Sequence, residues 1–410
     1  MRRLFPVAVG TFVLAVLIPV GRIVVWAQRS PSPQWITAWA SSQHALGTGA
    51  ISNATVRLIA RVTIPGEAVR LRFDNTFGTA PVVIGSAYVG HRVQGPALRP
   101  GSNHRVMFNQ ASRVTIPTGG SVVSDPIALN VLAGQDLAVS LYLPESDVRP
   151  SQHTLAFVTS YLTANGAGDV AADETRTPFT STTTSMLWLK AIDVLTSTHT
   201  GAIVTFGDSI TDGNCSTIDA QNRWEDWLAV RIDLENDRQR GVRKAVVNEG
   251  ISGNTIGRDN LRPAPDSPPG LERLDRDVLS HHGVTDVVLF MGTNDIRREA
   301  SADQVMSGMQ EIAKRVKARG LKLVGVTVIP RHNNTTNSPW DGAKTATRNR
   351  VNQWIRTKAP FDGVLDFDMV VRDPANPDLI YGPFNCDDIH PTPRGYYEMG
   401  RSVPLDVFRR

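Results

Sequence analysis

Cysteine is rare in this sequence, with only Cys215 and Cys386 among 410 residues. The sequence also lacks an H-E-x-x-H motif and any Cys/His cluster with metal-ligand spacing, so no bound metal is expected. It has no G-x-x-x-x-G-K-[ST] motif, and no G-x-G-x-x-G follows a predicted strand. We therefore expect no nucleotide cofactor.

The first residues have the pattern of a secretory signal peptide. Arg2 and Arg3 precede an apolar run, and Val25, Trp26 and Ala27 can serve as a small-residue cleavage site. We expect residues 1–27 to be a signal peptide and the protein to be secreted or periplasmic, with no stable membrane partner after cleavage. A retained membrane anchor stays open as the alternative, because residues 4–20 approach spanning length.

The chain carries no strong excess of charge of one sign. Its formal charge is +4, and three of these positive charges (Arg2, Arg3 and Arg22) lie before the predicted cleavage site, where no acidic residue occurs. Cleavage would leave the mature chain at +1, so no basic field indicates a nucleic-acid partner.

Short apolar runs separated by Gly, Pro, Asn and Asp dominate residues 28–198. In "AVRLRFDN", the apolar residues Val69, Leu71 and Phe73 alternate with polar ones, which predicts a half-buried strand. Gly66 is expected to supply a hairpin turn before it. We predict an N-terminal antiparallel, jelly-roll-like β-sandwich over residues 28–198.

The pattern changes at residues 199–410, where strand-like and helical segments alternate. "AIVTF" is followed by "RWEDWLAVRIDLEN", and "TDVVLFMG" precedes "SADQVMSGMQEIAKRVKARG". Helices between apolar strands predict a parallel sheet covered on both faces, which is a three-layer α/β/α domain. Active sites in such sheets lie at the carboxyl ends of the strands.

Residues suited to nucleophilic catalysis follow the predicted strands. Ser209 lies in "GDSITDG", and "DDIHP" offers His390 as a base with Asp387 three residues earlier. Gly253 in "GISGN" and Asn294 in "GTND" could donate hydrogen bonds to an oxyanion. Taken singly, Gly253, Asn294 and His390 are each better explained by an ordinary turn or by the surface.

Together, "GDSITDG", "GISGNT", "GTND" and "DDIHP" resemble the four ordered signatures of the SGNH hydrolase superfamily, also called GDSL esterases and lipases. The resemblance covers most of residues 200–400. The N-terminal half also resembles secreted bacterial members that carry a β-rich region, notably in "WITAWASS". One departure is GDSI instead of GDSL.

The resemblance implies a cofactor-free serine esterase acting on a small-molecule or glycan ester, with short-acyl or acetyl groups expected. Ser209 would be the nucleophile, His390 the base and Asp387 the orienting acid. The N–H groups of Ser209 and Gly253 and the Asn294 amide would hold the oxyanion. A carbohydrate-binding protein with an inactive hydrolase domain and a polysaccharide deacetylase-type acetyl esterase remain as alternatives.

The two cysteines lie on loops that must meet if this triad forms. Cys215 follows Ser209 by six residues, and Cys386 directly precedes Asp387. Given the expected export, we predict a Cys215–Cys386 disulfide, with two free thiols as the alternative.

Three further residues near these segments receive weaker interpretations. Asp208 is expected to shape the turn before Ser209 by bonding backbone groups. Asp212 has no assigned role. His332 follows a predicted strand and is expected to be solvent-exposed rather than a substrate contact.

Overall fold

The computed structural model describes residues 32–236, 241–332 and 339–409. The chain from Pro33 onward forms one compact unit. The predicted signal peptide, residues 1–27, lies outside the described residues. Within these described ranges, no helix combines the length and the apolar character needed to cross a membrane.

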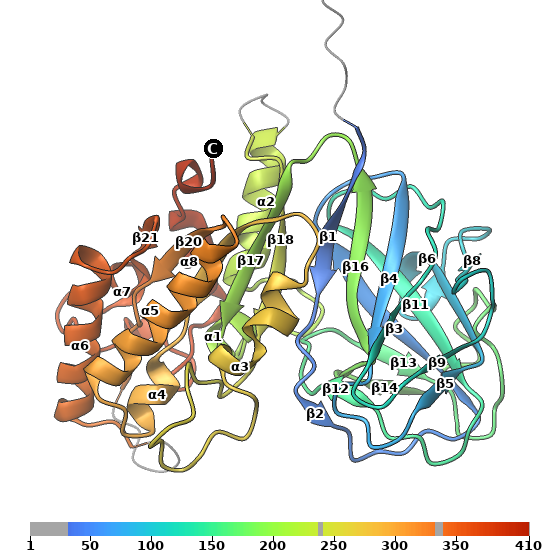
Figure 1. Cartoon of the computed structure of the whole chain (residues 1–410), viewed down its shortest axis with the longest axis horizontal. Helices are drawn as coiled ribbons and strands as arrows, with labels where there is room; N and C mark the ends of the chain where they lie inside the picture. Colours follow the sequence, from blue (N-terminus) through green and yellow to red (C-terminus); the bar gives the residue numbers. More distant parts are fainter. Residues whose placement is uncertain (1–31, 237–240, 333–338, 410) are drawn as a thin grey trace, which may run out of the picture. The chain divides into compact units, whose positions relative to one another are not determined.

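The first half of the described chain is built from antiparallel sheets (Figure 1). The strand order of the smaller main sheet is β1 (Gln34–Ala40), β16 (Leu189–Thr196), β4 (Ala68–Asp74) and β10 (Ser121–Val123). The larger sheet runs β14 (Ser181–Thr183), β13 (Ser160–Leu162), β3 (Ala54–Val62), β11 (Gln135–Leu143), β6 (Ser86–Gln94) and β7 (Ala97–Leu98), with β8 (His104–Arg105) also on β6. One small sheet contains β15 (Met186–Leu187), β12 (Ser151–His153) and β2 (Ala45–Leu46). Another pairs β5 (Val82–Ile84) with β9 (Val114–Ile116).

The prediction of a hairpin at Gly66 is wrong, because the flanking strands β3 and β4 belong to different sheets. Gly66 instead lies in a connection between the sheets, where its N–H donates to the carbonyl of Val131 at 3.0 Å. A Cβ at this position would lie 2.4 Å from the carbonyl oxygen of Leu195 in β16. Close packing of two backbones, rather than a tight turn, therefore requires glycine here.

The prediction of one exposed face for β4 is also wrong. Arg72 and Asp74, on its polar face, are 7% and 2% exposed. The Arg72 guanidinium donates to the carbonyl of Ser280 at 3.0 Å and lies 2.5 Å from Nδ1 of His281, both in the second half of the chain. The local alternation is real, but a distant segment covers the polar face.

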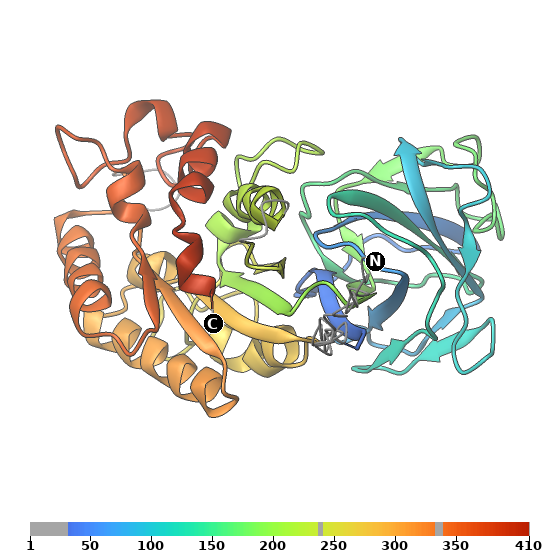
Figure 2. The same ribbon diagram turned by 90° about the horizontal axis from the view of Figure 1, so that it is seen from above.

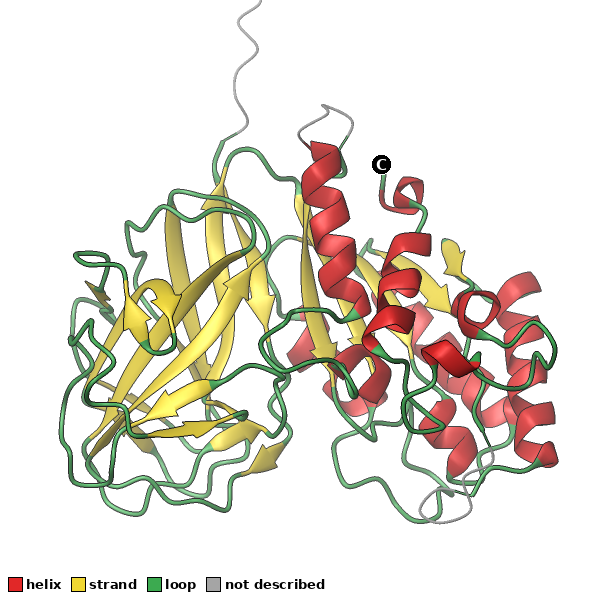
Figure 3. Cartoon of the chain, turned by 180° about the vertical axis from the view of Figure 1, so that it is seen from behind, coloured by secondary structure: helices red, strands yellow, loops and turns green. Residues whose placement is uncertain are grey.

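The second half contains a five-stranded parallel sheet with helices on both faces (Figure 3). Its strand order is β18 (Lys244–Gly250), β17 (Gly201–Gly207), β19 (Val284–Phe290), β20 (Lys322–Val326) and β21 (Gly363–Leu365). The helices are α1 (Ser209–Asp212), α2 (Trp224–Asn236), α3 (Gly270–Leu274), α4 (Thr293–Arg297), α5 (Ala302–Ala318), α6 (Gly342–Thr357), α7 (Phe367–Val371) and α8 (Pro393–Ser402). Shorter helical turns are η1 (Asp275–Leu279, π-helical), η2 (Gly382–Phe384) and η3 (Leu405–Phe408). This arrangement confirms the predicted α/β fold behind an antiparallel β region.

Alternate side chains of the parallel strands pack into two separate apolar clusters. On one face, Ile203 of β17 packs with residues of α2, α7 and α8. On the other, Val204 packs with residues of α3, α5 and α6. Figure 2 shows the two groups of helices on opposite sides of the sheet. A strand that is buried on both faces explains the continuous apolar run "AIVTF".

The two halves share buried apolar surface. The cluster that contains Val204 continues into the antiparallel region, where it includes Ile36 of β1. The boundary predicted between residues 198 and 199 falls in the connection from β16 to β17. The division into two domains at that point stays a prediction.

Candidate active site

Ser209 lies where the first parallel strand turns into the first short helix. Strand β17 ends at Gly207, Asp208 caps α1, and Ser209 is the first helical residue. The chain runs from β17 to β18 on one side and then to β19 on the other, so the strand order reverses here. Ligands of open α/β sheets bind in the crevice at this switch point.

Two local features fix the turn before Ser209. The Asp208 carboxylate accepts the N–H of Ile210 at 3.0 Å, which is the turn-shaping role expected for it. A Cβ at Gly207 would come within 2.1 Å of the Thr211 hydroxyl oxygen. Glycine therefore lets the strand pass close to the helix that follows.

The structure brings Ser209, His390 and Asp387 into one hydrogen-bonded chain. The His390 Nε2 lies 2.8 Å from the Ser209 Oγ, although 181 residues separate them. The His390 Nδ1 lies 2.8 and 3.0 Å from the two carboxylate oxygens of Asp387. Because a carboxylate only accepts, Nδ1 carries the proton and Nε2 is left to accept one from the serine.

The loop that carries His390 is held by Asp387 itself. One Asp387 oxygen accepts the backbone N–H of His390 at 2.8 Å and that of Ile389 at 3.2 Å. Partial burial opposes ionisation, but these bonds and the imidazole lower the pKa of Asp387 to about 2. The carboxylate is therefore charged at neutral pH.

A disulfide joins the loop that follows Ser209 to the loop that carries His390. Cys215 and Cys386 are bonded, with a Cα–Cα distance of 6.4 Å. The predicted pairing is thus present in the structure. It connects the segment after α1 to the residue directly before Asp387, and therefore ties together the two loops that meet at the triad.

Gly253 lies in a tight turn next to the end of β18. The N–H of Asn254 donates to the carbonyl of Ile251 at 3.1 Å, and Gly253, the third residue of this turn, has φ = +76°. A positive φ at this position is typical of a type II turn and explains the glycine. A Cβ would meet no atom within 4 Å, so backbone conformation rather than space requires it.

Hydrogen-bond donors are available at the predicted oxyanion positions. Within the described ranges, no acceptor pairs with the backbone N–H of Ser209 or of Gly253. The Asn294 Nδ2 donates to the carbonyl of Asn254 at 3.0 Å, which orients the amide. Since an amide NH2 has two hydrogens, the second is left for another acceptor.

A second buried carboxylate anchors the segment that carries Asn294. Asp295 accepts the N–H of Ile256 at 3.0 Å and that of Gly257 at 3.4 Å, which joins α4 to the loop after β18. Burial raises the pKa of Asp295 to about 6 and that of Asp208 to about 7. Asp295 thus links the two loops that hold the candidate oxyanion donors.

Sequence reasoning did not foresee the surroundings of Asp212. Its carboxylate lies 2.9 Å from Nε2 of His153, a residue of the antiparallel region, and 2.8 Å from the N–H of Ser252. No local pattern marks His153, because its partner lies 59 residues away. Only the folded chain shows this contact.

The expectation that His332 is solvent-exposed needs correction. Its side chain is only 27% exposed. Its backbone N–H donates to the carbonyl of Asp388 at 2.9 Å, and its Nε2 lies 2.9 Å from the carbonyl oxygen of Ile380. His332 thus supports the loop next to Asp387.

One group of three potential metal ligands occurs within the described residues, and it is Cys215, Asp387 and His390. Cys215 is consumed by the disulfide, and both ring nitrogens of His390 already have protein partners. This group therefore suits nucleophilic chemistry at Ser209 better than metal binding.

The comparisons with known proteins give a family for the second half. Residues 205–397 match the GDSL-like Lipase/Acylhydrolase family. No curated protein sequence matches the chain.

Several solved structures are similar to about half of the chain. One is Est24, a carbohydrate acetylesterase from Sinorhizobium meliloti, with 17% identity and a TM-score of 0.39, covering 50% of this chain and 97% of the other. The aryl esterase of M. smegmatis has 18% identity and a TM-score of 0.38, covering 49% and 95%. A GDSL-like lipase from Bacteroides thetaiotaomicron has 18% identity and a TM-score of 0.34, covering 50% and 87%. The family match identifies residues 205–397 of this chain as a GDSL-like lipase/acylhydrolase domain of the SGNH type.

Proposed function

We propose that this protein is a serine carboxylic-ester hydrolase that forms an acyl-enzyme on Ser209. The observation that carries the proposal is the hydrogen-bonded chain from Ser209 through His390 to Asp387, with 2.8 Å at each link. A hydroxyl in contact with an imidazole whose other nitrogen faces a carboxylate is the arrangement that activates a serine.

The first half of the proposed reaction forms the acyl-enzyme. His390 Nε2 takes the proton of the Ser209 hydroxyl as Oγ attacks the ester carbonyl carbon. Asp387 keeps the imidazole in the required orientation and stabilises its positive charge. The imidazolium then returns the proton to the leaving alcohol as the ester bond breaks.

The second half of the proposed reaction releases the carboxylic acid. Water attacks the acyl carbon while His390 again accepts a proton, and Ser209 is regenerated. In both halves the negative charge on the former carbonyl oxygen is received by the N–H groups of Ser209 and Gly253 and by the Asn294 amide.

The proposed substrates are esters with short-acyl or acetyl groups. Ser209 and His390 are 5% and 7% exposed, so the reacting atoms lie in a confined space. Such low exposure of both reacting residues favours a small acyl group over a bulky one. The alcohol part is a small molecule or a glycan, and an acetylated polysaccharide is one candidate within this class.

The test is turnover of p-nitrophenyl acetate by the wild-type chain and by Ser209→Ala. We expect the wild type to hydrolyse the ester and to be labelled by a fluorophosphonate. Ser209→Ala should lose both the hydrolysis and the labelling. Ser216→Ala is a matched control, because the Ser216 hydroxyl is buried without a hydrogen-bond partner in the described part of the chain. Labelling that survives Ser209→Ala would overturn the proposal.

A substrate panel separates the remaining possibilities. Activity should be highest on acetyl esters and fall as the acyl chain lengthens, and an acetylated glycan tests the polysaccharide alternative. A carbohydrate-binding protein with an inactive hydrolase domain would bind the glycan and show no turnover dependent on Ser209.

We also propose that the protein is exported. The Cys215–Cys386 disulfide supports this, because such bonds persist in oxidising compartments. Cleavage after Ala27 would make Gln28 the first residue of the exported chain, and N-terminal sequencing of that chain would test it.

A further inference from the structure

His153 comes from the antiparallel region and lies fully inside the protein, with 3% exposure. It ends β12 (Ser151–His153). Its Nδ1 lies 2.8 Å from the carbonyl oxygen of Ser42, and its Nε2 lies 2.9 Å from an Asp212 carboxylate oxygen. Both partners are acceptors, so both ring nitrogens must carry a proton for the two bonds to form together.

The charges around His153 support this protonated form. Burial opposes it, but the Asp212 carboxylate and, more weakly, Glu249 raise the pKa of His153. The neighbouring His44 ring lies edge-on at 4.9 Å, and burial lowers its pKa to about 4, so it remains neutral. His153 and Asp212 therefore form a buried ion pair.

The second oxygen of Asp212 reaches the turn that carries Gly253. It accepts the backbone N–H of Ser252 at 2.8 Å, and the Ser252 hydroxyl lies 2.6 Å away. Ser252 is the second residue of the turn and Gly253 the third. The orientation of the Gly253 N–H is thus set from one side by Asp212.

We propose that His153 and Asp212 are positioning residues through which the antiparallel region holds the Gly253 N–H in place for the oxyanion. The inference rests on the proposed function of Ser209. Donors stabilise an oxyanion best when they are fixed before the reaction, and a small misplacement of a reacting group can cost about 100-fold in rate. The β region then contributes to catalysis without touching the substrate.

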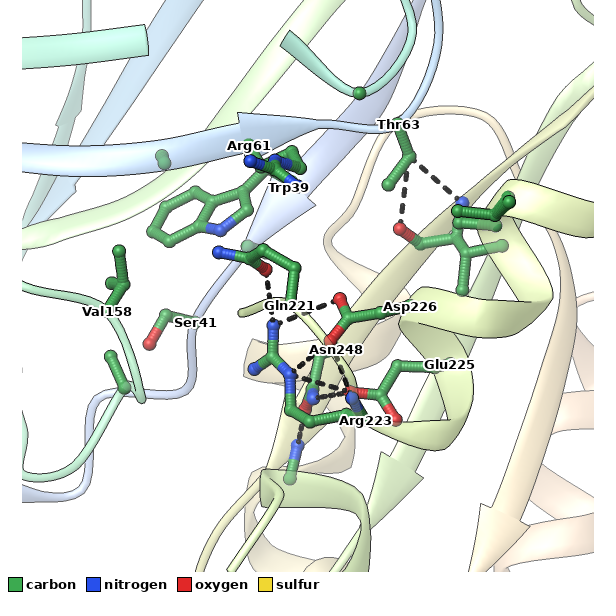
Figure 4. Close-up of a pocket in the computed structure, with 18 of the residues that line it drawn as sticks. Trp39, Ser41, Arg61, Thr63, Val158, Gln221, Arg223, Glu225, Asp226 and Asn248 are labelled. Carbon is green, nitrogen blue, oxygen red and sulfur yellow. Dashed lines mark hydrogen bonds and ion pairs between the residues drawn. The ribbon is translucent and has the colours of Figure 1, made fainter. Parts of the chain in front are cut away.

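A cavity borders this contact and offers a direct way to test it. Its volume is about 190 Å³, and His153, Asp212, Trp39 and Val158 are among the residues that line it. Figure 4 shows residues that line the cavity, among them Arg223, whose guanidinium pairs with Asp226 at 2.9 Å. A small molecule that enters the cavity could reach the space left by a truncated His153.

The first experiment compares His153→Gln and Asp212→Asn with the wild type. We expect kcat and kcat/KM for p-nitrophenyl acetate to fall by the same factor, about 10- to 100-fold, because transition-state stabilisation alone is lost. Thr63→Val is the matched control. The Thr63 hydroxyl contacts the backbone N–H and C=O of Val246 at 3.1 Å, so it joins the same two regions away from Ser252 (Figure 4).

Chemical rescue distinguishes positioning from general destabilisation. His153→Ala enlarges the cavity, and added imidazole is expected to restore part of its kcat. The same addition should leave Asp212→Asn unchanged, because His153 still fills its own space there. No rescue in a folded His153→Ala protein would count against the proposal.

Amide hydrogen exchange supplies a measurement that does not depend on activity. Exchange in the peptide covering residues 250–254 should accelerate in His153→Gln and Asp212→Asn and stay at the wild-type rate in Thr63→Val. Unchanged exchange, unchanged kcat, or an equal loss of kcat in Thr63→Val would overturn the proposal. A wild-type protein without Ser209-dependent turnover would instead refute the proposed function, whatever the exchange shows.

Discussion

Removal of the Cys215–Cys386 disulfide should destabilise the protein strongly while leaving the proposed active site largely formed. The bond closes a loop with a sequence separation of 171 residues. The chain-entropy relation gives about 5 kcal/mol for such a loop, which is an upper figure because residual structure in the unfolded chain reduces it. We expect the Cys215→Ser/Cys386→Ser variant to lose free energy of unfolding up to this amount.

The loop that carries Asp387 and His390 should keep its conformation because its own hydrogen bonds remain. The Cys386 N–H donates to the carbonyl of His390 at 3.0 Å, and Asp387 holds the backbone of His390 at 2.8 Å. Turnover at 25 °C should therefore stay close to that of the wild type. Urea unfolding should show a lower midpoint, with a steeper dependence on urea because the unfolded chain without the cross-link exposes more surface.

Reduction and single variants supply the controls. Dithiothreitol should shift the wild-type midpoint toward that of the double variant and leave the double variant unchanged. Each single cysteine variant should lose about as much free energy of unfolding as the double variant, since each removes the same bond. Two free thiols in the denatured, non-reduced wild-type protein would refute the reasoning, as would a double variant with an unaltered midpoint.

Two further substitutions test the oxyanion donors and the buried acid beside the nucleophile. Asn294→Ala should lower kcat for p-nitrophenyl acetate roughly 100- to 1000-fold, and a loss below about tenfold would contradict the assignment of its amide as an oxyanion donor. Asp208→Asn should change the pH dependence of stability. Burial raises the pKa of Asp208 to about 7, so its contribution to stability is complete below about pH 4 and is lost as pH rises through 7. Urea unfolding measures the free energy of unfolding of Asp208→Asn relative to the wild type at pH 4 and at pH 8. Between the two pH values this difference should shift in favour of the variant by at most about 4 kcal/mol. An equal difference at both pH values would refute this.

The segments at the ends of the parallel strands show which parts of the candidate site could be predicted from local sequence. Ser209, Gly253 and Asn294 follow three parallel strands that lie side by side in the sheet, so their meeting at one edge could be predicted from the alternation of strands and helices. The contact between Asp387 and His390 could also be predicted from their spacing. A separation of three residues lets the carboxylate bond both the ring and the backbone of the histidine.

The antiparallel region shows where this reasoning failed. The composition around Gly66 predicts a hairpin, but the strands on either side pair in different sheets. Pairing among antiparallel strands depends on contacts between distant segments, and turn residues alone do not specify them. In the same way, the polar face of β4 was expected to be exposed because nothing in its own sequence indicates the segment that covers Arg72.

By itself, the sequence determined the α/β class, the antiparallel region before it and the candidate residues at Ser209, Asp387 and His390, because these depend on periodicity and on short motifs. Only the tertiary structure decided that His153 lies against Asp212 and that Asp212 holds Ser252. The physical reason is that burial of a charged side chain depends on its partner. A histidine in a short strand and an aspartate three residues after Ser209 carry no local signal of each other until the chain folds.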